Sequence, residues 1–157
     1  MWAQEYVMAL NIKQVYESAA ESLEFDLDIP EDRLAEIKRY SLKDFHISGG
    51  VYNRSGIVSL KYRAVFTLNA ECDRCLKPIE KKFDCRFKHL LLRQSDSDSD
   101  DDEYIVTCGD ILELEDIAVQ DALLQLPAKL LCREDCKGLC IVCGADLNLG
   151  ECGCGSK

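Results

Sequence analysis

Eight of the ten cysteines in this chain lie in four closely spaced pairs, and thiolates at such spacings bind metal ions. A pair separated by two residues fits a tight turn in which both sulfurs converge on one ion, and Gly144 permits such a turn directly after Cys143. Four pairs supply two sites of four sulfurs each, the closed set that Zn²⁺ prefers. The sequence therefore predicts two structural zinc ions, held by Cys72, Cys75, Cys132, Cys136, Cys140, Cys143, Cys152 and Cys154.

Two groupings of these pairs are consistent with the spacing. In the preferred grouping, the last two pairs share one ion in a compact ribbon-like loop, and Cys72 and Cys75 share the other ion with Cys132 and Cys136. The alternative grouping joins Cys132 and Cys136 to the pair that follows them and leaves the first pair with the last. The preferred grouping would tie the tail of the chain to its middle, because its second ion joins pairs far apart in the sequence.

The other two cysteines and both histidines are not expected to bind metal. Cys85 alternates with polar residues on the apolar face of a strand and should act as a small hydrophobic side chain, and His89 shares that face. Cys108 is isolated beside a glycine, and His46 has no partner that the sequence identifies.

Redox chemistry is the main alternative to structural zinc. Cys136, Cys140 and Cys143 have the spacing of the cluster motif of radical-SAM enzymes, but no barrel follows to hold a substrate. An iron–sulfur cluster without that chemistry stays open as an alternative. A reactive thiol pair needs a helix N-terminus or nearby cations, whereas Cys72 is expected in a link between strands. Because no catalytic triad, phosphate-binding glycine loop or carboxylate pair is recognisable, we predict that the protein is not an enzyme.

The charge distribution favours a protein partner over free RNA. The formal net charge is −10 and the isoelectric point is about 4.7, whereas phosphate backbones are bound by lysine and arginine. Six of the negative charges lie in the run 95–103, which we expect to be a solvated acidic loop, so the rest of the chain carries −4. A local basic patch outside this run is still compatible with the overall charge.

The composition predicts a soluble protein of a reducing compartment, the cytoplasm. A hydrophobic share of 47% and a charged share of 31% are typical of globular domains. No apolar run approaches the roughly 18 residues of a membrane helix, and the first residues do not form a secretory signal. Clustered cysteines without such a signal favour metal binding over disulfides.

Alternating apolar residues place the first cysteine pair at the tip of a long hairpin. Apolar and polar positions alternate over 58–69 and again over 82–91, as in two antiparallel strands that share one buried face. Further strands are expected at 23–29, 45–53 and 104–107.

Apolar residues at helical spacing predict helices at 12–19 and 112–126, the first after a capping box that begins at Asn11. The tail contains little apolar material and needs cross-linking to fold. We therefore predict an α+β fold in two parts. Residues 1–129 form an antiparallel sheet, open or barrel-like, with two or three helices, and residues 130–157 form a Cys-rich, zinc-ribbon-like tail packed on it.

Two blocks of sequence resemble the YceD family, which is named for large ribosomal RNA subunit accumulation. The first block is 71–78, which reads ECDRCLKP. The second block spans 126–148 and contains LCREDCKGLC followed by CGADLN. One departure is Ile141, where the family usually has proline between the two cysteines, and this affects the rigidity of the turn rather than the ligands.

The resemblance implies a non-enzymatic bacterial factor of ribosome biogenesis that supports the accumulation of large-subunit ribosomal RNA. It also implies a ribosomal protein or a large-subunit assembly intermediate as partner, because genes of this family commonly lie beside the gene of a small zinc-ribbon ribosomal protein. Two modes of action are open. The acidic surface could shield or deliver a basic ribosomal protein, or Lys129, Arg133 and Lys137 in the tail could contact structured RNA. A thiol redox or iron–sulfur protein unrelated to ribosomes is the alternative function.

Overall fold

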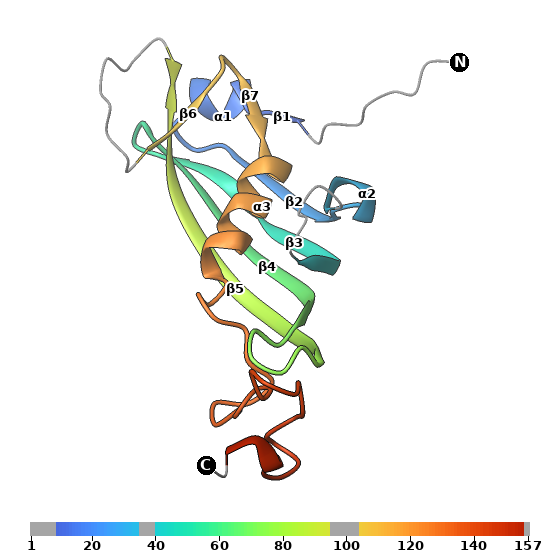
Figure 1. The fold of residues 1–157 in the computed structure, drawn as a ribbon. Coiled ribbons are helices and arrows are strands. Elements are labelled where there is room, and N and C mark those ends of the chain that lie inside the picture. Colours follow the sequence, from blue (N-terminus) through green and yellow to red (C-terminus); the bar gives the residue numbers. More distant parts are fainter. Residues whose placement is uncertain (1–8, 35–39, 95–103, 156–157) are drawn as a thin grey trace.

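The computed structural model describes residues 9–34, 40–94 and 104–155, so the acidic run 95–103 lies outside the described part. Within that part, three α-helices, seven strands and one 3-10 turn follow one another along the chain (Figure 1). Their bounds are β1 Ala9–Asn11, α1 Lys13–Glu17, β2 Ser22–Asp28, α2 Glu31–Leu34, β3 Ser41–Arg54, β4 Ile57–Glu71, β5 Pro78–Arg93, β6 Tyr104–Thr107, β7 Ile111–Glu113, α3 Leu114–Gln125 and η2 Gly153–Gly155.

The predicted hairpin lies at the centre of a five-stranded sheet with the strand order β2-β3-β4-β5-β6. β4 and β5 pair antiparallel from Val58 opposite Leu91 to Glu71 opposite Pro78. Every second residue of β4 from Val58 to Leu68 is buried, because alternate side chains of a strand point to opposite faces. The predicted hairpin is therefore confirmed, and the strands expected at 23–29 and 45–53 are present as β2 and β3.

One expectation about the sheet was wrong. The sheet is mixed rather than antiparallel, because β6 pairs with β5 in parallel, with Leu90 opposite Tyr104. Ten residues separate Arg93 from Tyr104. A parallel strand requires the chain to return to the end of the sheet at which β5 begins, and a tight turn cannot do this. Of the two forms expected, open or barrel-like, the described strands adopt the open one, and β1 and β7 pair separately as a small second sheet.

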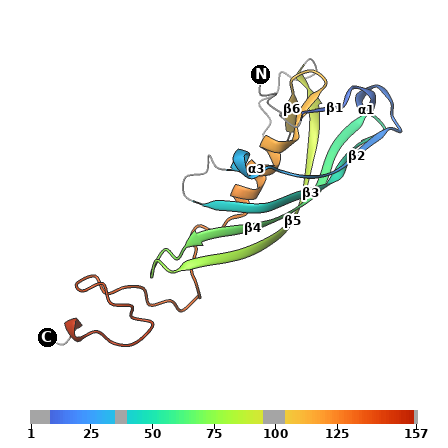
Figure 2. The same ribbon diagram turned by 90° about the vertical axis from the view of Figure 1, so that its right-hand side faces the viewer.

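Helix α3 confirms the helix predicted at 112–126, and it covers one face of the five-stranded sheet (Figure 2). Its buried residues include Leu114, Ala118 and Ala122. Ala118 and Ala122 are small, and small side chains let a helix approach a sheet closely. Among the described elements, no helix covers the opposite face of β4 and β5 (Figure 2).

A polar contact fastens α3 to the sheet. The Tyr62 hydroxyl donates a hydrogen bond to Asp121 Oδ2, and His89 Nε2 lies 2.6 Å from the same oxygen. Burial, reinforced by the bond to Asp121, raises the pKa of Tyr62 far above its usual range. His89 thus has a polar partner inside the sheet–helix interface.

The first predicted helix is shorter than expected. α1 ends at Glu17, because the next residue, Ser18, is extended. Asn11 Oδ1 accepts the N–H of Lys13 at 3.0 Å, but the N-cap position belongs to Ile12 and the expected capping box does not form.

The tail after α3 has little regular structure. It contains an isolated bridge between Leu139 and Asp146 and the short turn η2. In Figure 1 it continues past the end of the sheet where β4 and β5 are joined. None of the helices in the described ranges is both long enough and apolar enough to cross a membrane.

Candidate metal centres

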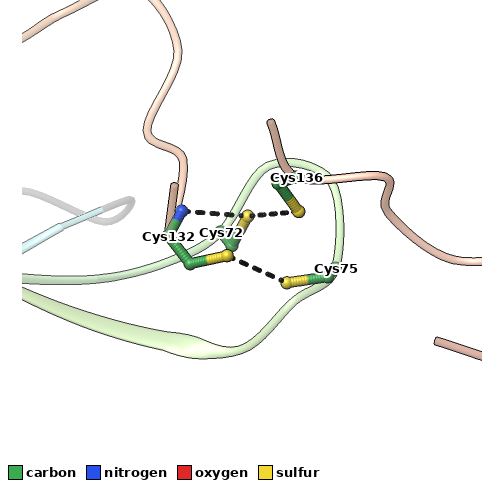
Figure 3. Close-up of side chains that lie close together, drawn as sticks. All are labelled: Cys72, Cys75, Cys132 and Cys136. Atoms are coloured by element: carbon green, nitrogen blue, oxygen red, sulfur yellow. Dashed lines mark hydrogen bonds between the residues drawn. The ribbon is translucent and has the colours of Figure 1, made fainter. Parts of the chain in front are cut away.

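The first group of cysteines, which we call site 1, joins the hairpin to the tail (Figure 3). Cys72 and Cys75 lie between β4 and β5, whereas Cys132 and Cys136 follow α3. All four sulfurs lie within 4.8 Å of one another. The distance between the sulfurs of Cys72 and Cys136 is 3.8 Å, and that between the sulfurs of Cys75 and Cys132 is 3.6 Å. Three of the four side chains are buried, and only Cys132 is exposed.

Backbone N–H groups point at the sulfur of Cys72. Burial opposes ionisation of this thiol, but the N–H groups of Cys75, Cys132 and Arg74 together lower its pKa to about 6. The Cys132 nitrogen lies 3.4 Å from that sulfur. Burial and then the neighbouring thiols raise the pKa of Cys132 to about 12, so negative charge collects first on Cys72. A cation placed among the four sulfurs would stabilise the negative charge on Cys72 and on the other sulfurs as they ionise.

Residues between the first two cysteines hold the tail against the hairpin. The Asp73 N–H donates to the Leu130 carbonyl at 2.8 Å, and Asp73 Oδ2 accepts the Leu130 N–H at 2.7 Å. Arg74 Nη1 donates to the Cys136 carbonyl at 2.7 Å. Gly138 has a φ of +77°, and a Cβ there would lie 3.0 Å from the Arg74 carbonyl oxygen. Glycine at 138 therefore permits the close approach of the tail.

The second group of cysteines, which we call site 2, lies wholly within the tail. The sulfurs of Cys140, Cys143, Cys152 and Cys154 all lie within 4.8 Å of one another. Cys143 and Cys154 are exposed, and the other two are half-buried. The N–H groups of Cys143 and Val142 contribute most to lowering the pKa of Cys140 to about 6, and the Val142 nitrogen lies 3.4 Å from the Cys140 sulfur.

The first pair of each site adopts the same backbone turn. The Cys72 carbonyl accepts the Leu76 N–H at 2.9 Å, and the Cys140 carbonyl accepts the Gly144 N–H at 2.8 Å. In both turns the N–H of the first cysteine donates to the carbonyl five residues on, at 2.8 Å. The φ angles of Leu76 and Gly144 are +60° and +73°. The positive φ predicted at Gly144 is therefore confirmed, and Leu76 adopts it without being glycine.

A side-chain bridge connects the two sites. Asn148 Nδ2 donates to the Cys136 sulfur at 3.4 Å, and Asn148 Oδ1 accepts the Lys137 N–H at 2.8 Å. Asp146 Oδ1 accepts two bonds from Asn148, and Asp146 Oδ2 lies 2.6 Å from Lys77 Nζ. The bond from Lys77 is the main reason that the pKa of Asp146 falls to about 2. Burial opposes ionisation of Cys136, but the Asn148 amide helps to bring its pKa below the usual value.

The geometry of both groups suits a single four-coordinate ion. A tetrahedron with metal–sulfur bonds of about 2.3 Å has sulfur–sulfur edges of about 3.8 Å. Both sulfur–sulfur distances given for site 1 agree with this edge length. A four-iron cluster would separate the sulfurs further, because each thiolate binds a different iron. Each group could therefore hold one metal ion.

The structure places the eight paired cysteines in the preferred grouping rather than in the alternative one. Cys85 is half-buried opposite Ala64, and burial raises the pKa of its thiol. Cys108 is exposed, and neither cysteine belongs to a metal-binding group among the described residues.

Sequence reasoning missed the residues that hold the ligands. Asp73, Arg74, Asp146 and Asn148 make the contacts that join the tail to the hairpin and site 2 to site 1. All four lie inside the two blocks that resemble the YceD family, so those blocks contained a signal that the cysteine spacing did not explain.

Known proteins resemble part of this chain. Uncharacterized proteins of Mycobacterium bovis and of two strains of Mycobacterium tuberculosis are each 31% identical over 80 residues. The match covers 49% of this chain and 39% of each relative, so it spans about two-fifths of their length. No solved structure matches the chain. The family described as "Large ribosomal RNA subunit accumulation protein YceD" matches residues 60–157, which is more than half of the chain and includes all eight paired cysteines. The chain therefore belongs to the YceD family.

Proposed function

We propose that the protein is a non-enzymatic factor of ribosome biogenesis that supports the accumulation of large-subunit ribosomal RNA. Membership of the YceD family is the observation that carries this proposal. The chemistry of the two cysteine groups agrees with it, because four-sulfur sites without an open ligand position serve as structural cross-links.

We further propose that both groups hold Zn²⁺. Four thiolates in tetrahedral arrangement suit zinc, and the sulfur–sulfur distances in site 1 match its bond length. The tail has few buried apolar residues beyond Leu130 and Cys136, so the metal supplies the cross-links that a hydrophobic core would otherwise provide. Site 1 then fixes the tail to the hairpin, and site 2 gives the tail its shape.

The partner that we propose is a large-subunit assembly intermediate or a ribosomal protein within it. Ile141 and Val142, at the tip of the turn in site 2, have relative exposures of 101% and 75%. Apolar side chains grouped at a surface are typical of sites that bind another protein. Because the metal-bound turn would hold them rigidly, such a contact would lose little conformational entropy on binding.

Depletion of the protein from its host tests the cellular role. Sucrose-gradient profiles of the depleted cells should show fewer large ribosomal subunits and an accumulation of immature precursors. Resupplying the wild-type chain should restore the profile, whereas a chain with Cys72→Ser and Cys75→Ser should not, because its tail is no longer tied to the hairpin. A normal profile in depleted cells would remove this function.

Metal analysis of the purified protein separates the proposal from the redox alternative. Two zinc ions per chain and a colourless solution are expected. A visible absorption band together with iron would favour an iron–sulfur protein, and metal-free thiols that cycle with a disulfide would favour a redox protein.

A further inference from the structure

The face of the sheet opposite α3 carries a group of exposed cations. Outward-facing positions alternate with buried ones along β4 and β5, so their side chains stand on the face that no described helix covers (Figure 2). Six cations occupy such positions on three adjacent strands, over about 20 Å along the strand direction. We call them the basic strip: Lys43, Lys61, Arg63, Lys82, Arg86 and Lys88.

Like charges face one another across the strands of the basic strip. Lys61 lies directly opposite Lys88, and Arg63 lies directly opposite Arg86. Like charges in directly opposed positions destabilise a sheet. Within the described part of the chain, Asp84 is the only carboxylate in an ion pair with the strip, and both of its oxygens bind Arg63. Arg63 and then the further cations around it lower the pKa of Asp84. The repulsion is thus left largely uncompensated, which favours an anionic ligand.

The opposite edge of the same face is acidic. Glu24, Asp26 and Asp28 occupy the outward positions of β2. His46 lies between the two edges, with its Nδ1 2.7 Å from Asp28 Oδ1 and its Nε2 3.4 Å from Asp26 Oδ1. His46 therefore has partners that the sequence did not reveal. An extended polyanion would be attracted to β4 and β5 and repelled from β2. It would therefore bind along β4 and β5 rather than along β2.

An aromatic side chain adjoins the basic strip. Tyr52 lies across Gly50, where a Cβ would come within 2.8 Å of the tyrosine hydroxyl oxygen. Lys61 Nζ lies 5.9 Å from the centroid of the Tyr52 ring. Aromatic rings beside cations are typical of protein surfaces that bind RNA, because the ring can contact bases or sugars while the cations bind phosphates. This combination favours RNA over an acidic peptide.

We propose that the basic strip binds the phosphate backbone of structured RNA in a large-subunit assembly intermediate. The choice of RNA rests on the proposed function, while the position of the surface rests on the arrangement of the charges. The net charge of −10 does not oppose local binding, because salt at physiological strength screens exposed charges beyond about 8 Å. This surface differs from the tail cations considered from the sequence. Of those, Arg133 is already engaged, with its Nε 3.3 Å from Asp135 Oδ1 and its Nη2 donating to Asn148.

Salt-dependent binding of a labelled RNA hairpin to the full-length, zinc-loaded protein tests the strip. The strip variant carries Lys61→Gln, Arg86→Gln and Lys88→Gln. A matched control carries Lys13→Gln, Lys129→Gln and Lys137→Gln, which lowers the net charge equally and removes two tail cations. The strip variant should bind at least about tenfold more weakly, and the slope of log Kd against log salt should fall by about 2–3. Its Tm should not fall, because the substitutions remove repulsion.

Several outcomes would overturn the inference. Equal weakening in both variants would show that only bulk charge matters, and weakening confined to the control would place the RNA contact in the tail. No binding by the wild-type protein, or equal displacement by polyglutamate of matched charge, would exclude RNA as the specific ligand. The proposed function fails separately, through a normal ribosome profile in depleted cells, so failure of one does not imply failure of the other.

Discussion

The two candidate metal centres begin with the same turn but differ in where their second pair of cysteines comes from. Both turns have the same closing hydrogen bonds, and both continue into a residue with positive φ. In site 1 the sulfurs brought together are separated by 57 and 64 residues of sequence. In site 2 all four lie in the tail. The same local turn is therefore part of a long-range cross-link in site 1 and of a local loop in site 2.

The residues inside the two turns explain the different roles. In site 1 the two positions between the cysteines are Asp73 and Arg74, and both bind the tail. In site 2 the same positions are Ile141 and Val142, and both side chains are exposed. The turn supplies two sulfurs in either case, whereas the intervening side chains determine what the turn contacts. Site 1 thus stabilises the fold, and site 2 presents a surface.

Serine substitution should produce the largest difference between the two sites. Replacing Cys72 and Cys75 should remove one metal and free the tail, and the Tm should fall by roughly 10 °C, as expected when a structural metal is lost. Replacing Cys152 and Cys154 should also remove one metal but should lower the Tm by less than half as much. Elemental analysis and thermal unfolding measure both effects. Loss of both metals from the second variant would show that the sulfurs are shared differently.

Metal release should distinguish the sites by exposure. Three of the four cysteines of site 1 are buried, whereas in site 2 two are exposed and two are half-buried. A chelator must reach the ion, so site 2 should lose its metal at least about tenfold faster than site 1, in two phases of equal amplitude. A coloured zinc indicator follows the release. The serine variant of site 2 is the control, since it should lack the fast phase, and a single phase in the wild type would contradict the difference in accessibility.

Most of the sheet could be predicted because one face of each strand is buried. The alternation from Val58 to Leu68 fixes which residues face the core, and a short link fixes the antiparallel hairpin. Alternation contains no information about strand direction, so the parallel pairing of β6 was not predictable from it. The buried face of α3 was only partly predictable, because Ala118 carries little hydrophobic signal and yet is buried.

The candidate ligands could be recognised by type and spacing, but their surroundings could not. Cysteine pairs are informative because few other roles require two thiols so close together. Asp73 and Asn148, by contrast, are ordinary polar residues whose partners lie elsewhere in the sequence. The charge of the basic strip was equally hidden, because Lys61 and Lys88 become neighbours only through the register of β4 and β5.

Substitution of Asn148 should affect site 1, although Asn148 lies between the cysteines of site 2 in the sequence. Asn148 follows the turn of site 2, yet its amide donates to a sulfur of site 1. Asn148→Ala should weaken metal binding at site 1 by about tenfold, as is typical when a partner of a metal ligand is removed, and should leave site 2 nearly unchanged. Chelator competition in the two serine backgrounds measures each site separately.

The variant Asn148→Asp controls for the lost side chain. It keeps the oxygen that accepts the Lys137 N–H but removes the N–H donor to Cys136. It should therefore weaken site 1 as Asn148→Ala does. Recovery of wild-type affinity in this variant would show that the contact with Lys137, rather than the donor to the sulfur, is what matters.

Proline in the turn of site 2 should give the smallest effect. It should strengthen metal binding, whereas the other substitutions weaken it. The Ile141 N–H makes no hydrogen bond within the described residues, and its side chain is fully exposed. Ile141→Pro should stiffen the unfolded loop and tighten site 2 by about two- to fivefold, equivalent to 0.4–1 kcal/mol. The same change at the matching position of site 1, Asp73→Pro, removes the N–H that bonds Leu130 and should weaken site 1. Chelator competition measures both. If proline acted in the same direction at both positions, the two turns would not differ in the way that their hydrogen bonds indicate.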